Sequence, residues 1–131
     1  MTFPIDVKEN LVTVRTSDGS VTQGEIVSTM RHFMDQASRY RDKQLLILDP
    51  GSGYNPSVNE VRQFAGFLRR VLGEVFTHVA LVVSRELHYG LGRMTEVITG
   101  FGKEGFRVFR TEEEALTWLH QVRETDEAKN P

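Results

Sequence analysis

The chain has 131 residues, no cysteine and a formal net charge of −2 from 16 basic and 18 acidic side chains. This length suits one domain with a core of its own, and the lack of cysteine excludes disulfides, thiolate zinc sites and cysteine nucleophiles. The sequence contains no Lys/Arg-rich run, so its charge pattern does not favour a nucleic-acid partner. The first residues show no secretory signal, and no apolar stretch approaches the ~20 residues that cross a bilayer. We therefore expect a cytoplasmic protein.

Two short β-prone runs open the chain, over residues 3–7 and 11–14, and Lys8-Glu9-Asn10 between them predicts a hairpin turn. After turn residues at 17–20, Thr22 and Glu25 have the spacing of a capping box and begin a helix. Its apolar side chains recur at helical spacing, which predicts a buried face made by Ile26, Met30, Phe33, Ala37 and Tyr40.

Two predicted strands, residues 44–49 and 76–83, contain the runs 45–48 and 79–83, which are apolar without alternation. Strands of this kind are buried on both faces, so we predict that these two are adjacent and central in the sheet. Prolines and glycines make residues 50–56 a loop. Ser57 and Glu60 then form a second capping box and begin the second helix.

The third helix carries an apolar stripe that we expect to pack on the sheet, formed by Leu87, Leu91, Met94, Ile98 and Phe101. A loop over residues 102–105, a strand over 106–109 and a helix capped by Thr111 complete the chain, the helix packing through Ala115, Leu119 and Val122.

This alternation of strands and helices predicts a single α/β domain over residues 1–125. We expect a four- to five-stranded, mostly parallel sheet with right-handed crossovers, flanked by about four helices. Residues 126–131 are polar and have little to bury, so they are predicted to form a disordered tail.

Ligands of open α/β sheets bind beyond the carboxyl ends of the strands. Two segments there, 49–57 and 84–89, hold the candidate ligand- or partner-binding residues, which are Asp49, Tyr54, Ser57, Ser84, Arg85, His88 and Tyr89. Gly51-Ser52-Gly53 lacks a phosphate-binding fingerprint, so we expect a flexible turn. Ser57 and Ser84 are placed as helix caps and lie outside any nucleophile elbow.

The four histidines show no metal-ligand spacing. We therefore expect no metal, no cofactor and no catalytic residue. A small hydrolase that uses Ser84, His88 and Asp49 is a third interpretation, without a recognised motif to support it.

Residues 106–119 resemble the closing strand and helix of the SpoIIAA-like branch of the STAS superfamily. A short strand ends at Phe109, an acidic helix start follows, and the helix continues as Ala115-Leu116-Thr117-Trp118-Leu119. Residues 82–84 and 89–94 are similar to the penultimate strand and helix of that branch, and the order of elements over residues 11–122 agrees with it.

The resemblance implies a bacterial binding or regulatory module without enzymatic activity. The best-known members of the superfamily are anti-sigma-factor antagonists that are phosphorylated on a serine at the start of the second helix, where Ser57 stands. Here Pro56 replaces the aspartate of the usual motif. We therefore predict that Ser57 is a structural cap and not a phosphoacceptor.

Two functions follow from these patterns. The leading hypothesis is a module that acts through protein contacts, made by the second helix and the loops at the strand ends. The alternative is a carrier of a small apolar or anionic, lipid-like ligand held between the sheet and the second and third helices. The 8 phenylalanines and 4 methionines exceed the needs of one small core and predict a homodimer formed through a helix face.

Overall fold

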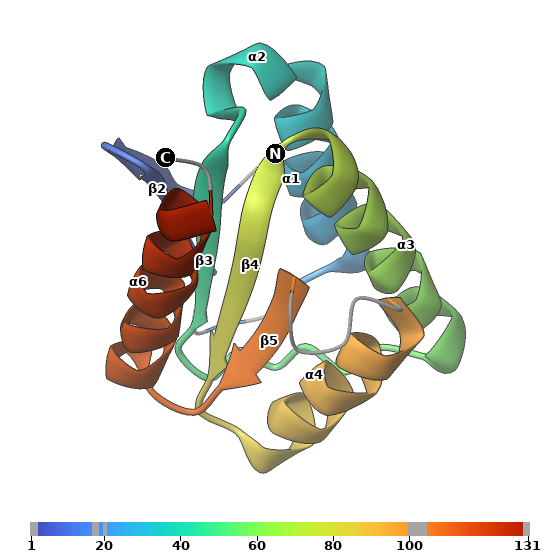
Figure 1. Ribbon diagram of the computed structural model, residues 1–131. Helices are drawn as coiled ribbons and strands as arrows, with labels where there is room; N and C mark the ends of the chain where they lie inside the picture. The colour runs from blue at the N-terminus through green and yellow to red at the C-terminus, as the bar shows by residue number, and fades with distance from the viewer. Residues whose placement is uncertain (1–2, 17–18, 20, 100–104, 130–131) are drawn as a thin grey trace.

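The computed structural model of the chain contains a five-stranded sheet with helices on both faces (Figure 1). It describes residues 3–16, 19, 21–99 and 105–129, and of residues 126–129 only the backbone. Residues 102–104 of the predicted loop and Phe101 of the predicted stripe lie outside these ranges.

The strands follow one another across the sheet in chain order, as β1 (Ile5–Lys8), β2 (Leu11–Arg15), β3 (Lys43–Asp49), β4 (Phe76–Val83) and β5 (Phe106–Phe109). Strands β1 and β2 form the predicted antiparallel hairpin, and every other neighbouring pair is parallel. Strands β3 and β4 are adjacent and central, which confirms the prediction from their unbroken apolar runs.

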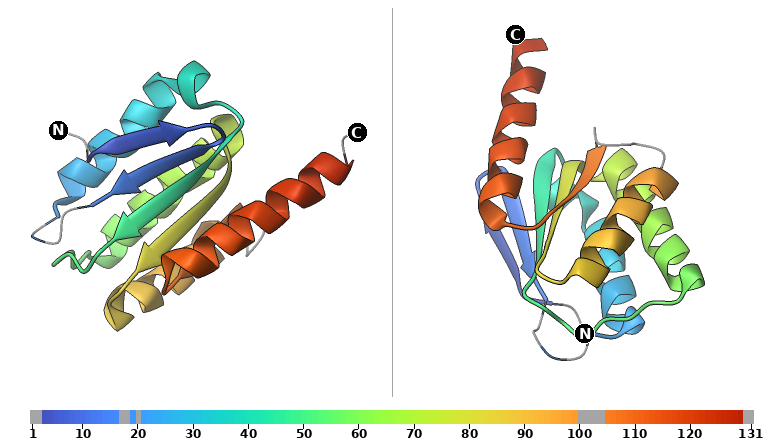
Figure 2. Two further views of the ribbon diagram at one scale, coloured as in Figure 1. Left: turned by 90° about the vertical axis from the view of Figure 1, so that its left-hand side faces the viewer. Right: turned by 90° about the horizontal axis from the view of Figure 1, so that it is seen from below.

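The described helices that connect parallel strands lie on one face of the sheet, as the right-hand view in Figure 2 shows. Because crossovers are right-handed and the strand order never reverses, each connection must return over the same face. These helices are α1 (Gln23–Asp35), α2 (Ala37–Tyr40), α3 (Val58–Glu74) and α4 (Glu86–Thr99). The opposite face is covered by α6 (Glu112–Lys129).

The helix starts are where the sequence predicts them. Thr22 Oγ1 accepts a hydrogen bond from the Glu25 amide at 3.1 Å, and Ser57 Oγ accepts one from the Glu60 amide at 3.2 Å. In both capping boxes the glutamate carboxylate accepts the amide of the cap residue in return. The helix predicted to run to Tyr40 is interrupted at Gln36 and continues as α2.

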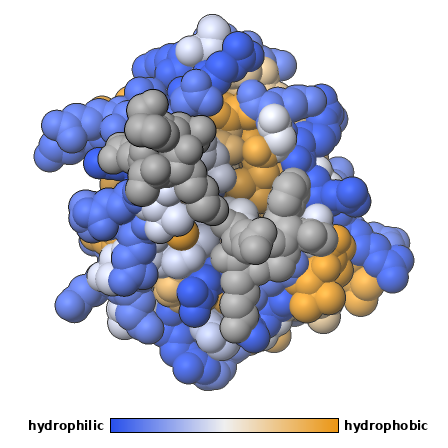
Figure 3. All heavy atoms as spheres, in the orientation of Figure 1, coloured by the Kyte–Doolittle hydropathy of each residue, from blue (hydrophilic) through white to orange (hydrophobic). Residues whose placement is uncertain are grey.

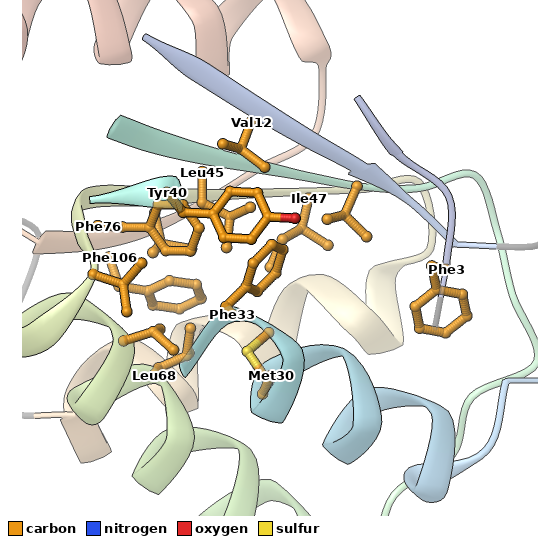
Figure 4. Close-up of a cluster of buried hydrophobic side chains, with 14 of the residues drawn as sticks. Phe3, Val12, Met30, Phe33, Tyr40, Leu45, Ile47, Leu68, Phe76 and Phe106 are labelled. Atoms are coloured by element: carbon orange, nitrogen blue, oxygen red, sulfur yellow. The ribbon is translucent and has the colours of Figure 1, made fainter. Parts of the chain in front are cut away.

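The larger core lies between the sheet and α1 to α4 and is centred on packed aromatic rings (Figure 4). Phe33 meets both Tyr40 and Phe76 edge-on, with ring centroids 5.0 Å apart in each pair. On the other face, Ala115 and Leu119 of α6 pack against β3, β4 and β5 as predicted, with Val122 partly buried beside them, and Trp118 joins this cluster. The backbone of α6 continues to Lys129, into the segment for which the sequence predicts disorder.

Helix α4 corrects one prediction, because three of the four described residues of its apolar stripe face away from the sheet. Leu87, Met94 and Ile98 are 50%, 44% and 37% exposed, and Leu91 is partly buried. The buried face instead consists of small or polar residues, which are His88, Gly92, Thr95, Glu96 and Thr99. The helix is therefore rotated by about one residue, roughly 100°, from the predicted orientation.

Two contacts with β5 account for this rotation. A Cβ atom on Gly92 would lie 2.6 Å from Val108 Cγ2, so the glycine permits a close approach that no other residue allows. Glu96 Oε2 accepts the Val108 amide at 2.8 Å. Strand β5 is at the edge of the sheet, where its outward amides need a partner from outside the sheet. The buried threonines donate to carbonyls of their own helix, Thr95 to Leu91 and Thr99 to Glu96.

Candidate functional site

A cavity of about 90 Å³ lies between the sheet and the layer formed by α1, α3 and α4. Strands β2, β3 and β4 form its floor through Val14, Ile47, Leu81 and Val83. The helices close it with apolar side chains that include Ile26, Met30, Phe33, Val61, Phe64 and Leu91. Phe3 also lines the cavity, and Figure 4 shows its ring set apart from the main aromatic group.

The polar groups at one end of this cavity come from the carboxyl ends of the central strands. Asp49 ends β3, Tyr54 belongs to the loop that follows, and His88 lies in the first turns of α4 after β4. Parallel strands bring their carboxyl ends to the same edge, which is why these residues meet despite their distance along the chain.

The loop after β3 is organised around the Asp49 carboxylate. Its Oδ1 accepts the amides of Gly51 and Ser52 at 3.0 and 2.8 Å, and Oδ2 accepts the Ser52 hydroxyl at 3.0 Å. Gly51 has φ +119°, a conformation that favours glycine. Ser52 is fully buried, and its carbonyl accepts Arg85 Nη1 at 3.1 Å. The predicted flexible turn is thus a defined structure that holds one carboxylate.

His88 is 4% exposed and bridges this loop to α4. Its Nε2 lies 2.7 Å from the Tyr54 carbonyl oxygen, and because a carbonyl can only accept, Nε2 must donate. Its Nδ1 lies 3.3 Å from Asp49 Oδ2, within ion-pair distance for a protonated ring, but the contact does not have the geometry of a hydrogen bond. Nδ1 therefore has a close neighbour and no hydrogen-bond partner among the described residues.

Tyr54 links the loop to the two helices at this end of the cavity. Its hydroxyl donates to Gln23 Oε1, and Gln23 Nε2 donates to Gln63 Oε1 at 2.8 Å and to the Glu60 carbonyl at 3.3 Å. Burial raises the pKa of Tyr54 to about 12, with a further contribution from the negative charge of Glu60. The phenol therefore remains a neutral donor at physiological pH.

The structure brings together some of the predicted site residues and separates others. Asp49, Tyr54 and His88 line the cavity, and Arg85 supports them through Ser52. Three other candidates, which are Ser57, Ser84 and Tyr89, do not line it. Ser57 is an exposed helix cap, Ser84 is exposed, and the ring of Tyr89 lies 4.0 Å beneath the Arg110 guanidinium.

Sequence reasoning missed Ser52 and Thr95, as well as the apolar wall. For Ser52 a signal existed, because a serine three residues after an aspartate in a glycine-rich turn is placed to bond back to the carboxylate. No sequence pattern indicated the apolar wall of the cavity, since its side chains come from separate elements and each has the pattern of an ordinary core residue.

The His88 geometry does not form a serine hydrolase triad. One ring nitrogen donates to the Tyr54 carbonyl and the other faces Asp49, so neither is directed at Ser84. Among the described residues, no cluster of His, Asp or Glu side chains has the arrangement of a metal site. No helix among the residues that the structure describes has the length and apolar character needed to span a bilayer.

The fold has a counterpart of known structure. No protein-family model matches the chain, and no curated protein matches it in sequence. A search of solved structures finds a fold described as SpoIIAA-like, and the chain therefore has a SpoIIAA-like α/β fold, as the resemblance of residues 106–119 implied.

The matching crystal structure is that of an uncharacterised protein of the DUF3478 family from Shewanella loihica PV-4. The match covers 88% of this chain and 90% of that one, with a TM-score of 0.53 and 18% sequence identity. At this identity the similarity establishes the fold, so arguments about function must come from the cavity itself.

Proposed function

We propose that this protein is a non-enzymatic binding module that holds a small, largely apolar molecule in the cavity between the sheet and α1, α3 and α4. The observation that carries the proposal is the cavity itself. Interiors of this kind pack to crystal-like density with few voids larger than water. A cavity of about 90 Å³ with a largely apolar lining is unusual in such an interior, so retaining one favours a role for it.

The cavity has the features of a ligand site. Its polar groups gather at one end while the remaining wall is apolar, the arrangement that orients a small amphiphilic ligand. Leu81, in the middle of central strand β4, is only partly buried, whereas its neighbour Ala80 is fully buried. The floor of the cavity is thus within reach of solvent.

The volume limits the enclosed part of the ligand. An engineered cavity of about 150 Å³ holds benzene. The cavity here is smaller, so the enclosed part is at most about the size of one six-membered ring. Helices α1, α3 and α4 would all contact such a ligand. The sequence predicted a ligand site between the sheet and the second and third helices, which are α3 and α4, and the cavity adds α1 to them.

Toluene is a suitable first probe, because it is apolar and its ring is the largest group that the enclosed volume allows, while its methyl group can extend towards solvent. Titration followed by methyl NMR should give saturable shifts of Ile47, Leu81 and Leu91. Leu81→Phe fills the cavity and should weaken toluene binding at least tenfold, whereas the matched control Leu116→Phe, on the opposite face of the molecule, should not. If neither toluene nor the cyclohexyl probes described below bind saturably to the wild type, the proposal is wrong.

A second candidate function, contact with another protein, is favoured by the outward face of α4. Leu87, Met94, Val97 and Ile98 are exposed there, and Figure 3 shows an apolar area at the lower right, where α4 lies in Figure 1. The leading hypothesis placed partner contacts on α3 and the strand-end loops. In the part of the chain that is described, exposed large apolar residues are instead most numerous on α4.

We infer that a second copy of this chain covers this face. Leu87, Met94 and Ile98 are exposed and lie seven and four residues apart, on one face of the helix, which another helix fits. In an antiparallel pair, Leu87 of one copy meets Ile98 of the other, so the stripe is self-complementary. A helix of 14 residues is about 20 Å long. Its face offers far less than the ~800 Å² per partner of a stable complex, so the dimer is weak.

Sedimentation at several concentrations tests this dimer. We expect self-association at high micromolar concentration that Met94→Lys abolishes and Leu116→Lys, on α6, preserves. Wild-type protein that stays monomeric at high micromolar concentration would contradict it.

We also propose that the protein acts in a bacterial cytoplasm. The cysteine-free sequence and the bacterial source of the structural counterpart support this location.

A further inference from the structure

Two hydrogen-bond acceptors face each other at the polar end of the cavity. Since His88 Nε2 donates to the Tyr54 carbonyl, the neutral ring carries a lone pair on Nδ1. This atom lies 3.3 Å from Asp49 Oδ2 and has no hydrogen-bond partner among the described residues. Both side chains line the cavity and both are largely buried.

Such a pair is unfavourable unless something donates to it. A buried acceptor loses its hydrogen bonds to water on folding, and two lone pairs at this distance repel each other. The three donors around Asp49 are the Gly51 and Ser52 amides and the Ser52 hydroxyl, and none of them reaches Nδ1. A donor for Nδ1 must therefore come from outside this set, either from water or from a bound molecule that displaces it.

We propose that the molecule bound here is uncharged and largely apolar, with one hydroxyl group that donates its hydrogen to the acceptor pair of His88 Nδ1 and Asp49 Oδ2. This inference rests on the proposed function and adds the chemical class of the ligand. A small alcohol or phenol satisfies it, with the hydroxyl at the pair and the hydrocarbon body against Ile47, Leu81 and Leu91.

Other head groups fit less well. A carboxylate or phosphate would meet the negative charge of Asp49, and the nearby cation, Arg85, donates to the Ser52 carbonyl and does not line the cavity. This argues against the anionic ligand considered from the sequence. A ketone or ether has no hydrogen to donate. An ammonium group would have to leave water for an apolar cavity, at a larger cost than an uncharged hydroxyl.

One alternative protonation state reverses the prediction. A ring with hydrogens on both nitrogens would donate from Nδ1, and the site would then select a ligand that accepts. In that state a strong charge-assisted bond to Asp49 is expected, whereas Nδ1 and Oδ2 are not aligned for one. The geometry therefore favours the neutral ring, and the choice between alcohol and ketone distinguishes the two states.

Three cyclohexyl probes of similar size separate these possibilities, namely cyclohexanol, cyclohexanone and cyclohexanecarboxylate. Affinities are measured by NMR titration of the wild-type protein at neutral pH. We expect cyclohexanol to bind about tenfold more tightly than cyclohexanone, the equivalent of one hydrogen bond, and the carboxylate to bind most weakly. Equal or tighter binding of the ketone, or tightest binding of the carboxylate, overturns the inference while leaving the cavity a ligand site. Failure of all three probes and of toluene overturns the proposed function with it.

The variant Asp49→Asn supplies the missing donor from within the protein. Two backbone amides donate to Oδ1 of residue 49, so the new amide must keep its oxygen there and place its NH₂ where Oδ2 lies. That group then donates to His88 Nδ1. The ratio of cyclohexanol to cyclohexanone affinity should fall from about tenfold to about twofold or less, whereas Glu86→Gln, an exposed change on α4, should keep it. An unchanged ratio in Asp49→Asn contradicts the inference.

A spectroscopic measurement on the wild-type protein requires no variant to fold. The imidazole ¹⁵N spectrum should show His88 Nδ1 as an unprotonated nitrogen that moves towards the hydrogen-bonded range when cyclohexanol is added and does not move with cyclohexanone. A protonated Nδ1 in the free protein, or equal shifts with both probes, would refute the proposal.

Discussion

Replacing Gly92 by alanine tests the orientation of helix α4, on which the cavity depends. A Cβ atom at this position would lie 2.6 Å from Val108 Cγ2 and 2.8 Å from Val108 Cβ. Carbon atoms in van der Waals contact are about 3.5–4.0 Å apart, so α4 must move away from β5 by roughly 1 Å. The Val108 Cβ atom is fixed to the backbone and cannot rotate out of the way.

The magnitude follows from a comparison with Gly90 on the same helix. Nothing lies within 4 Å of a Cβ atom at Gly90, and the residue is exposed. Both substitutions gain the same helix propensity, about 1 kcal/mol, but only Gly92→Ala adds an overpacking penalty of about 1–3 kcal/mol. Gly90→Ala should therefore be stabilising, and the two variants should differ by about 2 kcal/mol, the overpacking penalty itself.

Urea unfolding followed by far-ultraviolet circular dichroism measures this difference. Adding Val108→Ala to Gly92→Ala should recover part of the loss, with a coupling energy of about 1 kcal/mol in a double-mutant cycle. The reasoning is refuted if both glycine substitutions stabilise the protein to the same extent, because α4 would then not approach β5 through Gly92.

Further predictions concern the cap, the sheet edge and the phenol. Ser57→Ala should lower the free energy of unfolding by about 1 kcal/mol while Ser57→Asp stays near neutral, and phosphopeptide mapping of protein from its native cells should find no phosphate on Ser57. Glu96→Ala should cost about 1–3 kcal/mol by leaving the buried Val108 amide unpaired, and Glu96→Gln, which keeps an acceptor, should recover most of that loss. Because the pKa of Tyr54 rises on folding from 10.0 to about 12, the folded state holds this proton more tightly. The contribution of this phenol to the free energy of unfolding should therefore be fully present below pH 10 and should decline as the pH rises from 10 to 12. The decline in denaturation midpoint over this range should be smaller in Tyr54→Phe, and equal declines would exclude Tyr54 as its source.

The sequence by itself determined the secondary structure and the order of the elements. Capping boxes at Thr22 and Ser57 are signals confined to four residues, and both helices begin there. Strands β3 and β4 are apolar on both faces, which requires cover from two sides and places them at the centre of the sheet. Local chemistry was sufficient for these features because each depends on neighbours along the chain.

The orientation of α4 was decided only by the tertiary structure. Its sequence offers two candidate buried faces, one apolar and one small and polar, and the apolar one is the better prediction from the helix alone. Packing reverses that choice, because Gly92 admits Val108 and the Glu96 carboxylate reaches an edge amide of β5. Both partners lie outside the helix, so periodicity within it does not reveal them.

The candidate site also has features that the sequence predicts and features that only the tertiary structure reveals. Asp49, Tyr54 and His88 could be predicted, because parallel strands bring their carboxyl ends to one edge. The cavity could not be predicted, since a void exists only where several elements fail to fill the space between them. Nor could it be predicted that His88 Nδ1 has no hydrogen-bond partner among the described residues. The proton of an imidazole is likewise placed by the partner of its other nitrogen, here a carbonyl of the distant β3–α3 loop.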